Sequence, residues 1–401
     1  GGGANRALSS SSNGLEKRPA LSFRDDCGRE FPSWHHTTLG TIIEPYSEKV
    51  HGEHDFEVLT SSREGLQRQI DHFGSQQRHD TDGYNIIPLG FCTYRNRSDD
   101  GRFTFNINKI SDKAIVSKFY PVFRFKNANS TFMTEYLNSS ARARKKLSVL
   151  AVGTSQVVLS FEALKSAKFD LPCKEEQDKI ASLLECLNER VELQRSFVDA
   201  LKKYKRGLLS NLFGEKITQG CTTKSYYFSE IAQRRSEKYD PTSGIEYPCV
   251  ELENIEQETG KILSTVPSTA QSSIKNIAKS GDTLFGKLRP YLRKYAFAQK
   301  TMACSSEIWA LIPSDAVLPK FLFYLVQTEQ FLRVANISSG TKMPRAEWSN
   351  IEKTEFFIPD PFVQRKVVSL LEGLDQKITF ADSALFSLNR LKASLMQQLF
   401  I

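Results

Sequence analysis

A long segment of this chain occurs twice. Residues 171–213 align without a gap with residues 358–400, 187 positions later, and 14 of the 43 aligned positions are identical. The same register extends upstream to two Gly-Thr pairs, at 153–154 and 340–341. A repeat of this length fixes the architecture, because it predicts two similar scaffolds within one chain.

Both copies are predicted to form one long helix with a coiled-coil seam. Apolar residues recur at alternating spacings of four and three, with charged residues between them, which is the heptad pattern. The seam positions of the first copy are Ile180, Leu184, Leu187, Val191, Val198, Leu201, Leu208 and Leu212. Those of the second copy are Val367, Leu371, Leu374, Ile378, Ala381, Leu385, Leu388, Leu395 and Leu399.

Polar residues interrupt this seam at Gln194, Lys205 and Lys392, where they weaken packing but fix the register. Asp360 is placed to cap the second helix, and Pro361 suits its first position. Because both seams lie in one chain, we expect each helix to pack against the other. A generic dimerisation coiled coil is the alternative, but it leaves the intervening segments unexplained.

The chain is expected to divide into five segments. These are a disordered, Gly/Ser-rich leader at 1–20, a first domain at 21–170, a first helix at 171–215, a second domain at 216–360 and a second helix at 361–401. The first residue is not Met, so we expect the natural terminus to lie elsewhere.

Both variable segments mix short strands with one or two helices, so the predicted fold class is α+β. Their element order is similar, but their residues hardly match. Strands are predicted at 56–60, 84–89, 103–108, 122–125 and 307–312, a strand and a turn at 247–255, and helices at 131–147 and 321–334.

The composition excludes several classes of protein. No apolar run approaches the ~20 residues of a membrane span. The net charge of +8 is compatible with nucleic acid but does not establish it. The seven cysteines include no Cys-x-x-Cys, which favours reduced thiols and a cytoplasmic location.

Motifs for catalysis and cofactor binding are not found. The histidine pairs His35-His36 and His51-x-x-His54 lack cysteine or helical partners and are read as surface residues, so no metal site is expected. Residues 281–288 almost fit a phosphate-binding loop, but Leu288 lacks the required hydroxyl. The chain is therefore predicted to be non-catalytic.

Basic and aromatic residues form a dense cluster in the second domain. Lys287, Arg289, Tyr291 and Arg293 share strand parity, and Lys294 adjoins them, so one face could present them to DNA. Arginine forms bidentate bonds to guanine, and both cations neutralise phosphates. A charged edge strand is the alternative.

The first domain and two loops supply the remaining DNA-binding candidates. Asparagine and glutamine read adenine, whereas arginine reads guanine. A polar loop or structural turn is the alternative for each residue. The candidates are Arg63, Gln67, Arg68, Tyr94, Arg95, Asn96, Arg97 and Gln156 in the first half, and Lys342 and Arg345 in the second.

These residues resemble the specificity (S) subunit of type I restriction–modification systems, over nearly all of the chain after the leader. The segments that carry the resemblance are LPCKEEQDKIASLL, LKKYKRGLLSNLF, VELENI, GDTLFGKLRPYLRKY, SSEIWAL and SSGTKMPRAEWSNI. The second helix departs from the family pattern at Phe362 and Val363, where two acidic residues are typical, but Gln364 and Lys366 keep its start recognisable.

The resemblance implies two small α/β target recognition domains separated by two long antiparallel coiled-coil helices, with an internal pseudo-twofold repeat. Each domain would read half of a bipartite DNA site, and the helices would act as a spacer. The domains differ, so the site should be asymmetric. The implied partners are two modification (methyltransferase) subunits and the restriction/translocase subunits. S-adenosylmethionine, ATP and Mg would belong to those partners, not to this chain. The alternative is a coiled-coil scaffold that binds proteins.

Overall fold

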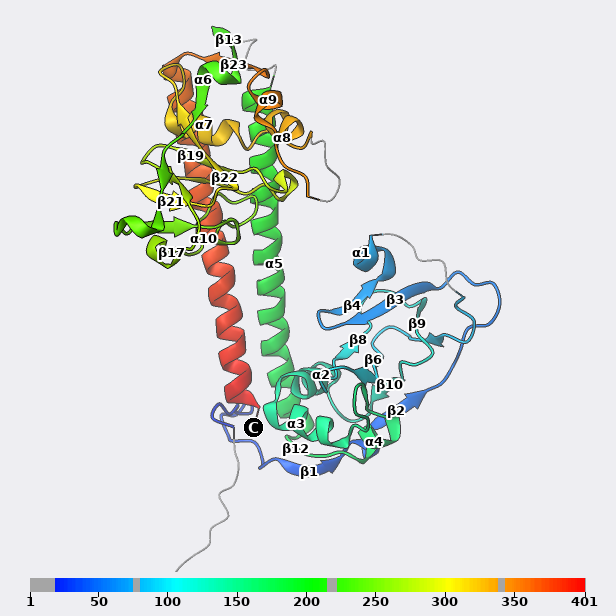
Figure 1. Cartoon of the computed structure of the whole chain (residues 1–401). Helices are drawn as coiled ribbons and strands as arrows, with labels where there is room; N and C mark the ends of the chain where they lie inside the picture. Colours follow the sequence, from blue (N-terminus) through cyan, green and yellow to red (C-terminus); the bar gives the residue numbers. More distant parts are fainter. Residues whose placement is uncertain (1–18, 75–79, 215–221, 338–342, 401) are drawn as a thin grey trace, which may run out of the picture. The chain divides into compact units, whose positions relative to one another are not determined.

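The computed structural model describes residues 19–74, 80–214, 222–337 and 343–400 (Figure 1). The chain divides into two compact units. Unit 1 comprises Gly1–Leu193 together with Leu385–Ile401, and unit 2 comprises Gln194–Ala384. The predicted leader lies almost wholly outside the described residues. No helix in the described part of the chain is long and apolar enough to cross a membrane.

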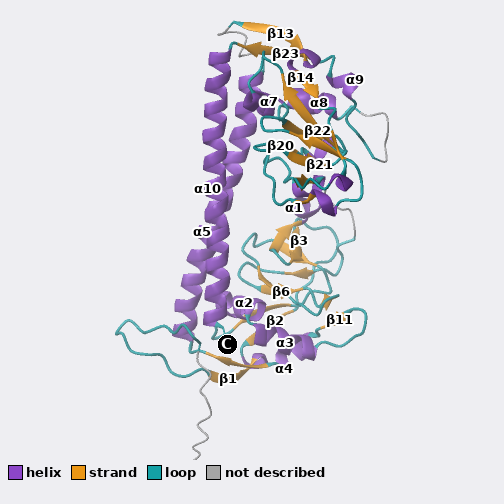
Figure 2. Cartoon of the chain, turned by 60° about the vertical axis from the view of Figure 1, so that its left-hand side comes forward, coloured by secondary structure: helices purple, strands orange, loops and turns teal. Residues whose placement is uncertain are grey.

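The repeated segment forms the two longest helices, α5 (Lys174–Phe213) and α10 (Pro361–Leu399), so the prediction of one long helix for each copy is confirmed. Within each unit they lie side by side and run in opposite directions (Figures 1 and 2). The predicted cap is present, because Asp360 Oδ1 accepts the backbone N–H groups of Phe362 at 2.8 Å and Val363 at 3.2 Å.

The seam residues of both helices are buried or half-buried. Two of the seam polar residues make specific contacts in unit 2. Gln194 Nε2 donates to the Ala381 carbonyl at 3.0 Å, and Lys205 Nζ pairs with Asp375 at 2.6 Å. Such contacts favour one register, because sliding either helix would leave buried polar atoms without partners.

Unit 1 contains two four-stranded sheets, with strand orders β2-β10-β6-β8 and β4-β3-β9-β5, and two strand pairs, β1-β12 and β7-β11. Its strands are β1 His35–Thr38, β2 Ile43–Tyr46, β3 Glu57–Ser62, β4 Gly65–Arg68, β5 Asn85–Ile86, β6 Cys92–Tyr94, β7 Arg97–Ser98, β8 Phe105–Ile107, β9 Ala114–Val116, β10 Val122–Phe125, β11 Val157–Val158 and β12 Lys168–Leu171. Its shorter helices are α1 Gln69–Phe73, α2 Ser130–Ser139, α3 Ala141–Leu150 and α4 Phe161–Ser166.

Unit 2 contains a four-stranded sheet of order β14-β22-β19-β20, a five-stranded sheet of order β15-β18-β21-β16-β17, and the pair β13-β23. Its strands are β13 Thr223–Tyr227, β14 Ala232–Arg234, β15 Lys238–Tyr239, β16 Pro248–Val250, β17 Val266–Pro267, β18 Lys275–Ala278, β19 Thr283–Gly286, β20 Tyr295–Phe297, β21 Met302–Cys304, β22 Ile308–Pro313 and β23 Glu355–Pro359. Its shorter helices are α6 Phe228–Ile231, α7 Pro319–Leu325, α8 Glu329–Ala335 and α9 Trp348–Ile351.

The two units share one topology, which their unlike sequences conceal. Strands β2, β10, β6 and β8 correspond in order to β14, β22, β19 and β20. In the second sheets, the parallel pair β3-β9 corresponds to the parallel pair β16-β21. The repeat therefore includes the domains as well as the long helices. At the place of β15, unit 1 has a single antiparallel bridge between Lys49 and Asn85 of β5.

Two predicted helices are each divided in the structure. Residues 131–147 form α2 and α3, because Ser140 ends the first and its hydroxyl accepts the Ala143 N–H at 3.2 Å to cap the second. Residues 321–334 fall in α7 and α8, where Thr328 caps α8 in the same way. The predicted strand at 84–89 shortens to β5. Residues 247–255, predicted as a strand and a turn, form β16 and a 3₁₀ turn at Leu252–Asn254.

The end of each long helix completes the core of a domain. Phe400 follows α10 and packs on Phe132 of α2 in unit 1, with ring centroids 5.8 Å apart. Phe213 ends α5 and packs on Phe321 of α7 in unit 2, at 4.8 Å. Thus each core combines one domain with the start of one long helix and the end of the other.

Candidate nucleic-acid interface

In each domain, the segment that follows a central strand lies beside a second loop predicted from the sequence to bind DNA. After β6, the Asn96 carbonyl accepts the Leu159 N–H at 2.9 Å. After β19, the Lys287 carbonyl accepts the Ala346 N–H at 2.8 Å. The chain following each central strand is thereby held beside the loop that carries Gln156 or Arg345.

In unit 1 this place holds a cluster of arginines, which we call the arginine pocket. It is a hollow of about 100 Å³ lined by Arg63, Arg95, Arg97 and Arg102, all of them exposed. Asp100 pairs with Arg63 at 2.8 Å. Hydrogen bonds from Ser98, Arg102 and Arg63 hold the pKa of Asp100 below its usual value, so the carboxylate remains charged.

Contacts to neighbouring side chains hold parts of this surface in place. Gln156 Nε2 donates to Asp99 Oδ1 at 3.0 Å, which ties the Gly-Thr loop to the segment after β6. The Arg97 guanidinium lies 5.3 Å from the ring centroid of Phe119. Arg95 and Arg97 nevertheless remain exposed, so the guanidinium groups can reach a ligand.

Other candidates in the first domain are placed differently. Tyr94 is fully buried and its hydroxyl donates to the Leu159 carbonyl at 3.0 Å, so its assignment as a DNA contact is corrected to a core residue. Burial also raises its pKa. Arg68 pairs with Glu57 at 2.6 Å, and Gln67 bonds to His72 at 2.9 Å. Asn96 is half-buried.

In unit 2 the prediction that Lys287, Arg289, Tyr291 and Arg293 share one face of a strand is wrong. β19 ends at Gly286, and residues Pro290–Leu292 form a 3₁₀ turn. Pro290 has no N–H to donate to a ladder, which opposes continued pairing. Arg289 and Arg293 flank the turn with φ of 52° and 51°, a left-handed conformation that is uncommon for a residue with a side chain.

The turn separates the predicted cluster into two groups. Arg293 forms two bonds to Glu329, at 2.7 and 3.2 Å, and Lys294 donates to the Leu252 carbonyl at 2.7 Å. These two residues, predicted to contact DNA, are engaged in holding the turn. Arg289 and Tyr291 are exposed at its tip, and Lys287 is half-buried. Lys342 lies outside the described residues.

Arg345 lies beside the same turn. Leu288 forms a β-bridge with Arg345, which is the counterpart of the β7-β11 pair in unit 1. The Arg345 guanidinium is about half exposed and pairs with Glu307 at 3.1 Å. Among the sequence-predicted cations that the structure describes in the second domain, Arg289 and Arg345 are therefore the exposed ones, and Lys287 is half-buried.

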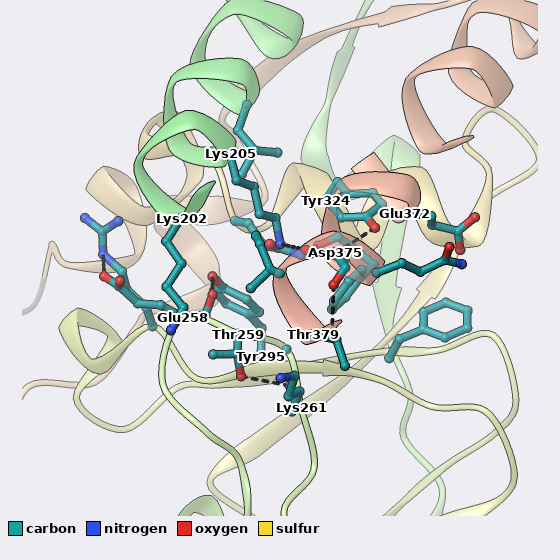
Figure 3. Close-up of a pocket in the computed structure, with 18 of the residues that line it drawn as sticks. Lys202, Lys205, Glu258, Thr259, Lys261, Tyr295, Tyr324, Glu372, Asp375 and Thr379 are labelled. Atoms are coloured by element: carbon teal, nitrogen blue, oxygen red, sulfur yellow. Dashed lines mark hydrogen bonds and ion pairs between the residues drawn. The ribbon is translucent and has the colours of Figure 1, made fainter. Parts of the chain in front are cut away.

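Each unit also contains a larger cavity where its domain faces the long helices. The cavity of unit 2, about 560 Å³, is lined by α5, α7, α10 and β20 (Figure 3). There Lys205 of α5 reaches Asp375 of α10 at 2.6 Å, and the Tyr324 hydroxyl of α7 donates to Asp375 at 2.9 Å. Burial and the neighbouring Asp375 raise the pKa of Tyr324, so it remains a donor.

The cavity of unit 1, about 440 Å³, occupies the equivalent place. It is lined by Glu135 of α2, Asn188 of α5 and Lys392 of α10, which stand where unit 2 has Tyr324, Asp375 and Lys205. Asn188 Nδ2 donates to Glu135 at 3.1 Å. Arg102, Glu135 and Asn188 are not among the residues predicted from the sequence, although the 187-residue offset that relates Asn188 to Asp375 could have indicated Asn188.

Comparison with known proteins identifies the family. The family model described as "Type I restriction modification DNA specificity domain" matches residues 54–202 and 228–384. The chain belongs to this family. One match lies in each half, in accord with the repeated topology, and together they cover most of the chain.

A curated relative and solved structures agree with this assignment. The type I restriction enzyme HindI specificity subunit of Haemophilus influenzae is 26% identical over 198 residues. That alignment covers 44% of this chain but only 40% of the relative. A crystal structure of the type I restriction–modification S subunit from M. genitalium matches with a TM-score of 0.57 at 16% identity, over 96% of this chain and 99% of that one.

A second solved structure, from work on complex assembly and conformational transition of the type I R-M system, gives a TM-score of 0.55 at 17% identity. It covers 92% of this chain and 98% of its own. At these identities the likeness concerns the fold: two domains of mixed helix and strand with two long helices.

Proposed function

We propose that this chain is the DNA-recognition subunit of a type I restriction–modification complex. It reads an asymmetric, bipartite DNA site and directs the partner methyltransferase and restriction subunits to that site. One observation carries the proposal. Two domains of the same topology expose cationic loops at the same place, but the loops carry different residues.

In the first domain, Arg95 and Arg97 are the proposed base readers. Both are exposed beside a loop held by hydrogen bonds, and a fixed guanidinium can form a bidentate pair with guanine. In the second domain, Arg289 and Tyr291 occupy the tip of the turn held by Arg293. A good bidentate base contact contributes about 1–3 kcal/mol of discrimination.

The chain itself carries no chemistry in this proposal. S-adenosylmethionine, ATP and Mg would be bound by the partner subunits, which methylate, translocate and cleave. The two long helices would set the distance between the half-sites, because both are unbroken: α5 has 40 residues and α10 has 39.

Exposed apolar side chains on the long helices support docking of partner subunits. They include Phe197, Tyr204 and Phe380 in unit 2, and Leu193, Phe386 and Leu391 in unit 1. Contiguous patches of exposed apolar residues are typical of protein interfaces, and these residues are proposed to belong to such patches. Because such residues occur on the helices of both units, we propose two modification subunits. A scaffold that binds only protein would share this feature but not the exposed arginine loops.

Base selection from a random DNA library, by the chain assembled with its modification subunits, tests the function. The unsubstituted protein should select two different half-sites. Arg97→Ala should relax one half-site by about 10-fold or more, since 1.4 kcal/mol is a factor of ten. Arg289→Ala should relax the other.

The assembly with partners should survive both substitutions and serves as the control. Arg190→Ala, on an exposed position of α5, should leave both half-sites intact. A protein that selects no sequence, or a palindrome, would contradict the proposal.

A further inference from the structure

The arginine pocket of unit 1 continues into the larger cavity beside the long helices. Arg63 and Arg102 line both hollows, so the two share a wall. Beyond that wall the larger cavity is lined by Arg144 of α3 and Lys392 of α10. A row of cationic side chains therefore runs from the proposed base-reading loop to a long helix.

The two cations of this row beyond the shared wall, Arg144 and Lys392, are unpaired within the described part of the chain. Among the described residues, neither the Arg144 nor the Lys392 side chain has a hydrogen-bond or ion-pair partner. The rest of the cavity wall is largely polar, with Asn106, Asn138, Thr131 and Thr134, and it also includes the carboxylates of Glu64 and Glu135. Unpaired cations in a polar wall suit an anionic ligand with many acceptor oxygens and do not suit an apolar one.

The unit 1 cavity combines Arg144 and Lys392, which have no partner in the described part of the chain, with three paired cations, Arg63, Arg102 and Lys109. The equivalent cavity of unit 2 has only paired cations among its described residues. Six cations line it, and each has a carboxylate partner within the unit. The six pairs are Lys202–Asp382, Lys205–Asp375, Arg206–Glu258, Lys261–Asp382, Arg293–Glu329 and Lys320–Glu372, at 3.4, 2.6, 3.4, 3.6, 2.7 and 3.2 Å. The fold itself thus does not require the free charges of unit 1, because the same place can be neutralised.

We propose that the cavity of unit 1 is a track for the DNA phosphate backbone, in which Arg144 and Lys392 are phosphate-positioning residues. This inference rests on the proposed function and deepens it. Phosphate oxygens accept bonds from arginine, lysine, asparagine and threonine, which are the side chains present. Such contacts add affinity and fix the register of the duplex, but they do not select a sequence. Of the two cavities beside the long helices, only that of unit 1 would contact the DNA backbone.

The salt dependence of DNA binding tests the track. The assembled complex is titrated with a duplex containing its site over a range of salt concentrations. Each phosphate contact contributes ~0.9 to the slope of log K against log [salt]. Arg144→Ala and Lys392→Ala should each lower the slope by ~0.9, and binding should weaken equally for specific and random duplexes.

Two matched variants control for charge and fold. Arg390→Ala removes an exposed cation two residues from Lys392 that does not line the cavity, and should leave the slope unchanged. Lys205→Ala, at the equivalent position in unit 2, should also leave the slope unchanged but should lower the thermal midpoint, because Asp375 loses its cationic partner.

Two results would overturn the track. One is a slope that is the same in Lys392→Ala and Arg390→Ala. The other is a Lys392→Ala defect confined to one DNA sequence. In either case the loss of one half-site in Arg97→Ala would show that the DNA-recognition function stands. If Arg97→Ala also left selection unchanged, the function itself would fail.

Discussion

Lys205 and Lys392 occupy the same position in the two copies of the repeat and meet different surroundings. Lys205 lies 8% exposed and bonds to Asp375, with the Tyr324 ring 5.5 Å away. Lys392 lines a cavity with Asn188, which stands in place of the aspartate, and Glu135, which stands in place of the tyrosine. In unit 2 the lysine joins the two long helices through its ion pair with Asp375. In unit 1 the charge of Lys392 has no partner among the described residues.

Both units have the same hydrogen-bonded joint, in which a glutamine connects the domain to the start of a long helix. Gln177 and Gln364 are identical in the repeat, buried, and bonded alike. Each Oε1 accepts the N–H at the start of a domain helix, Asn129 at 2.9 Å and Leu318 at 2.8 Å. Each Nε2 donates to the carbonyl of the proline before the helix, at 2.9 Å in both cases. The comparison teaches that the repeat preserves the joint and allows the ligand-facing residues to change.

The largest expected difference concerns the aromatic ends of the long helices. Phe400→Ala should cost about 3–5 kcal/mol, the usual range for a buried phenylalanine, because Phe400 contacts both Phe132 and Tyr136 in the core of unit 1. Phe213→Ala should cost less, since Phe213 is only half-buried. Denaturant unfolding measures the total loss, and hydrogen exchange assigns it to a unit. Equal losses of stability in the two variants would contradict the expected difference. A loss in unit 2 for Phe400→Ala, or in unit 1 for Phe213→Ala, would contradict the proposed placement of the two helix ends.

The glutamine joints should show an intermediate effect. Gln177→Ala and Gln364→Ala should each cost about 1–3 kcal/mol, because a partly buried N–H and a buried carbonyl lose their partner. Gln364→Ala should cost more, since its Nε2 also donates to the Ala316 carbonyl at 2.9 Å. Gln376→Ala, exposed on the same helix, is the control for helix propensity. A cost near zero at either joint would mean that water replaces the side chain.

The smallest expected effect is a loss of stability in acid, which unit 1 should show and unit 2 should not. In the β1-β12 pair, Asp170 faces His36 across the strands at 2.9 Å, whereas Phe357 of β23 faces Ser225. The hydrogen bond from His36, with the charge of Arg142, lowers the pKa of Asp170 below 3.8. A lowered pKa means that the folded state gains stability above that pH and loses it as the pH falls through the folded value.

Asp170 is about one-third exposed, so this gain should amount to ~0.5 kcal/mol. Asp170→Asn should reduce the stability of unit 1 at pH 7 by that amount and leave it unchanged near pH 2. Denaturant unfolding at the two pH values measures the difference. A loss of the same size at both would assign the effect to packing.

The features that the sequence predicted correctly are local or periodic. The long helices follow from sustained heptad spacing, and the cap of α10 from Asp360 and Pro361 in adjacent positions. The outlines of the shorter elements were less accurate. Ser140 and Thr328 divided two predicted helices, because a capping hydroxyl outweighs a continuing apolar period.

The sequence by itself determined that this protein has two copies of one scaffold, how each long helix begins and which face of it is buried. Those properties depend on residues within a few turns of one another. Only the tertiary structure decided that Tyr94 lies in the core, that a 3₁₀ turn parts Arg289 from Arg293, and that Lys392 stays free while Lys205 is paired. Each of these depends on a partner far away in the chain, and no local period encodes which partner that is.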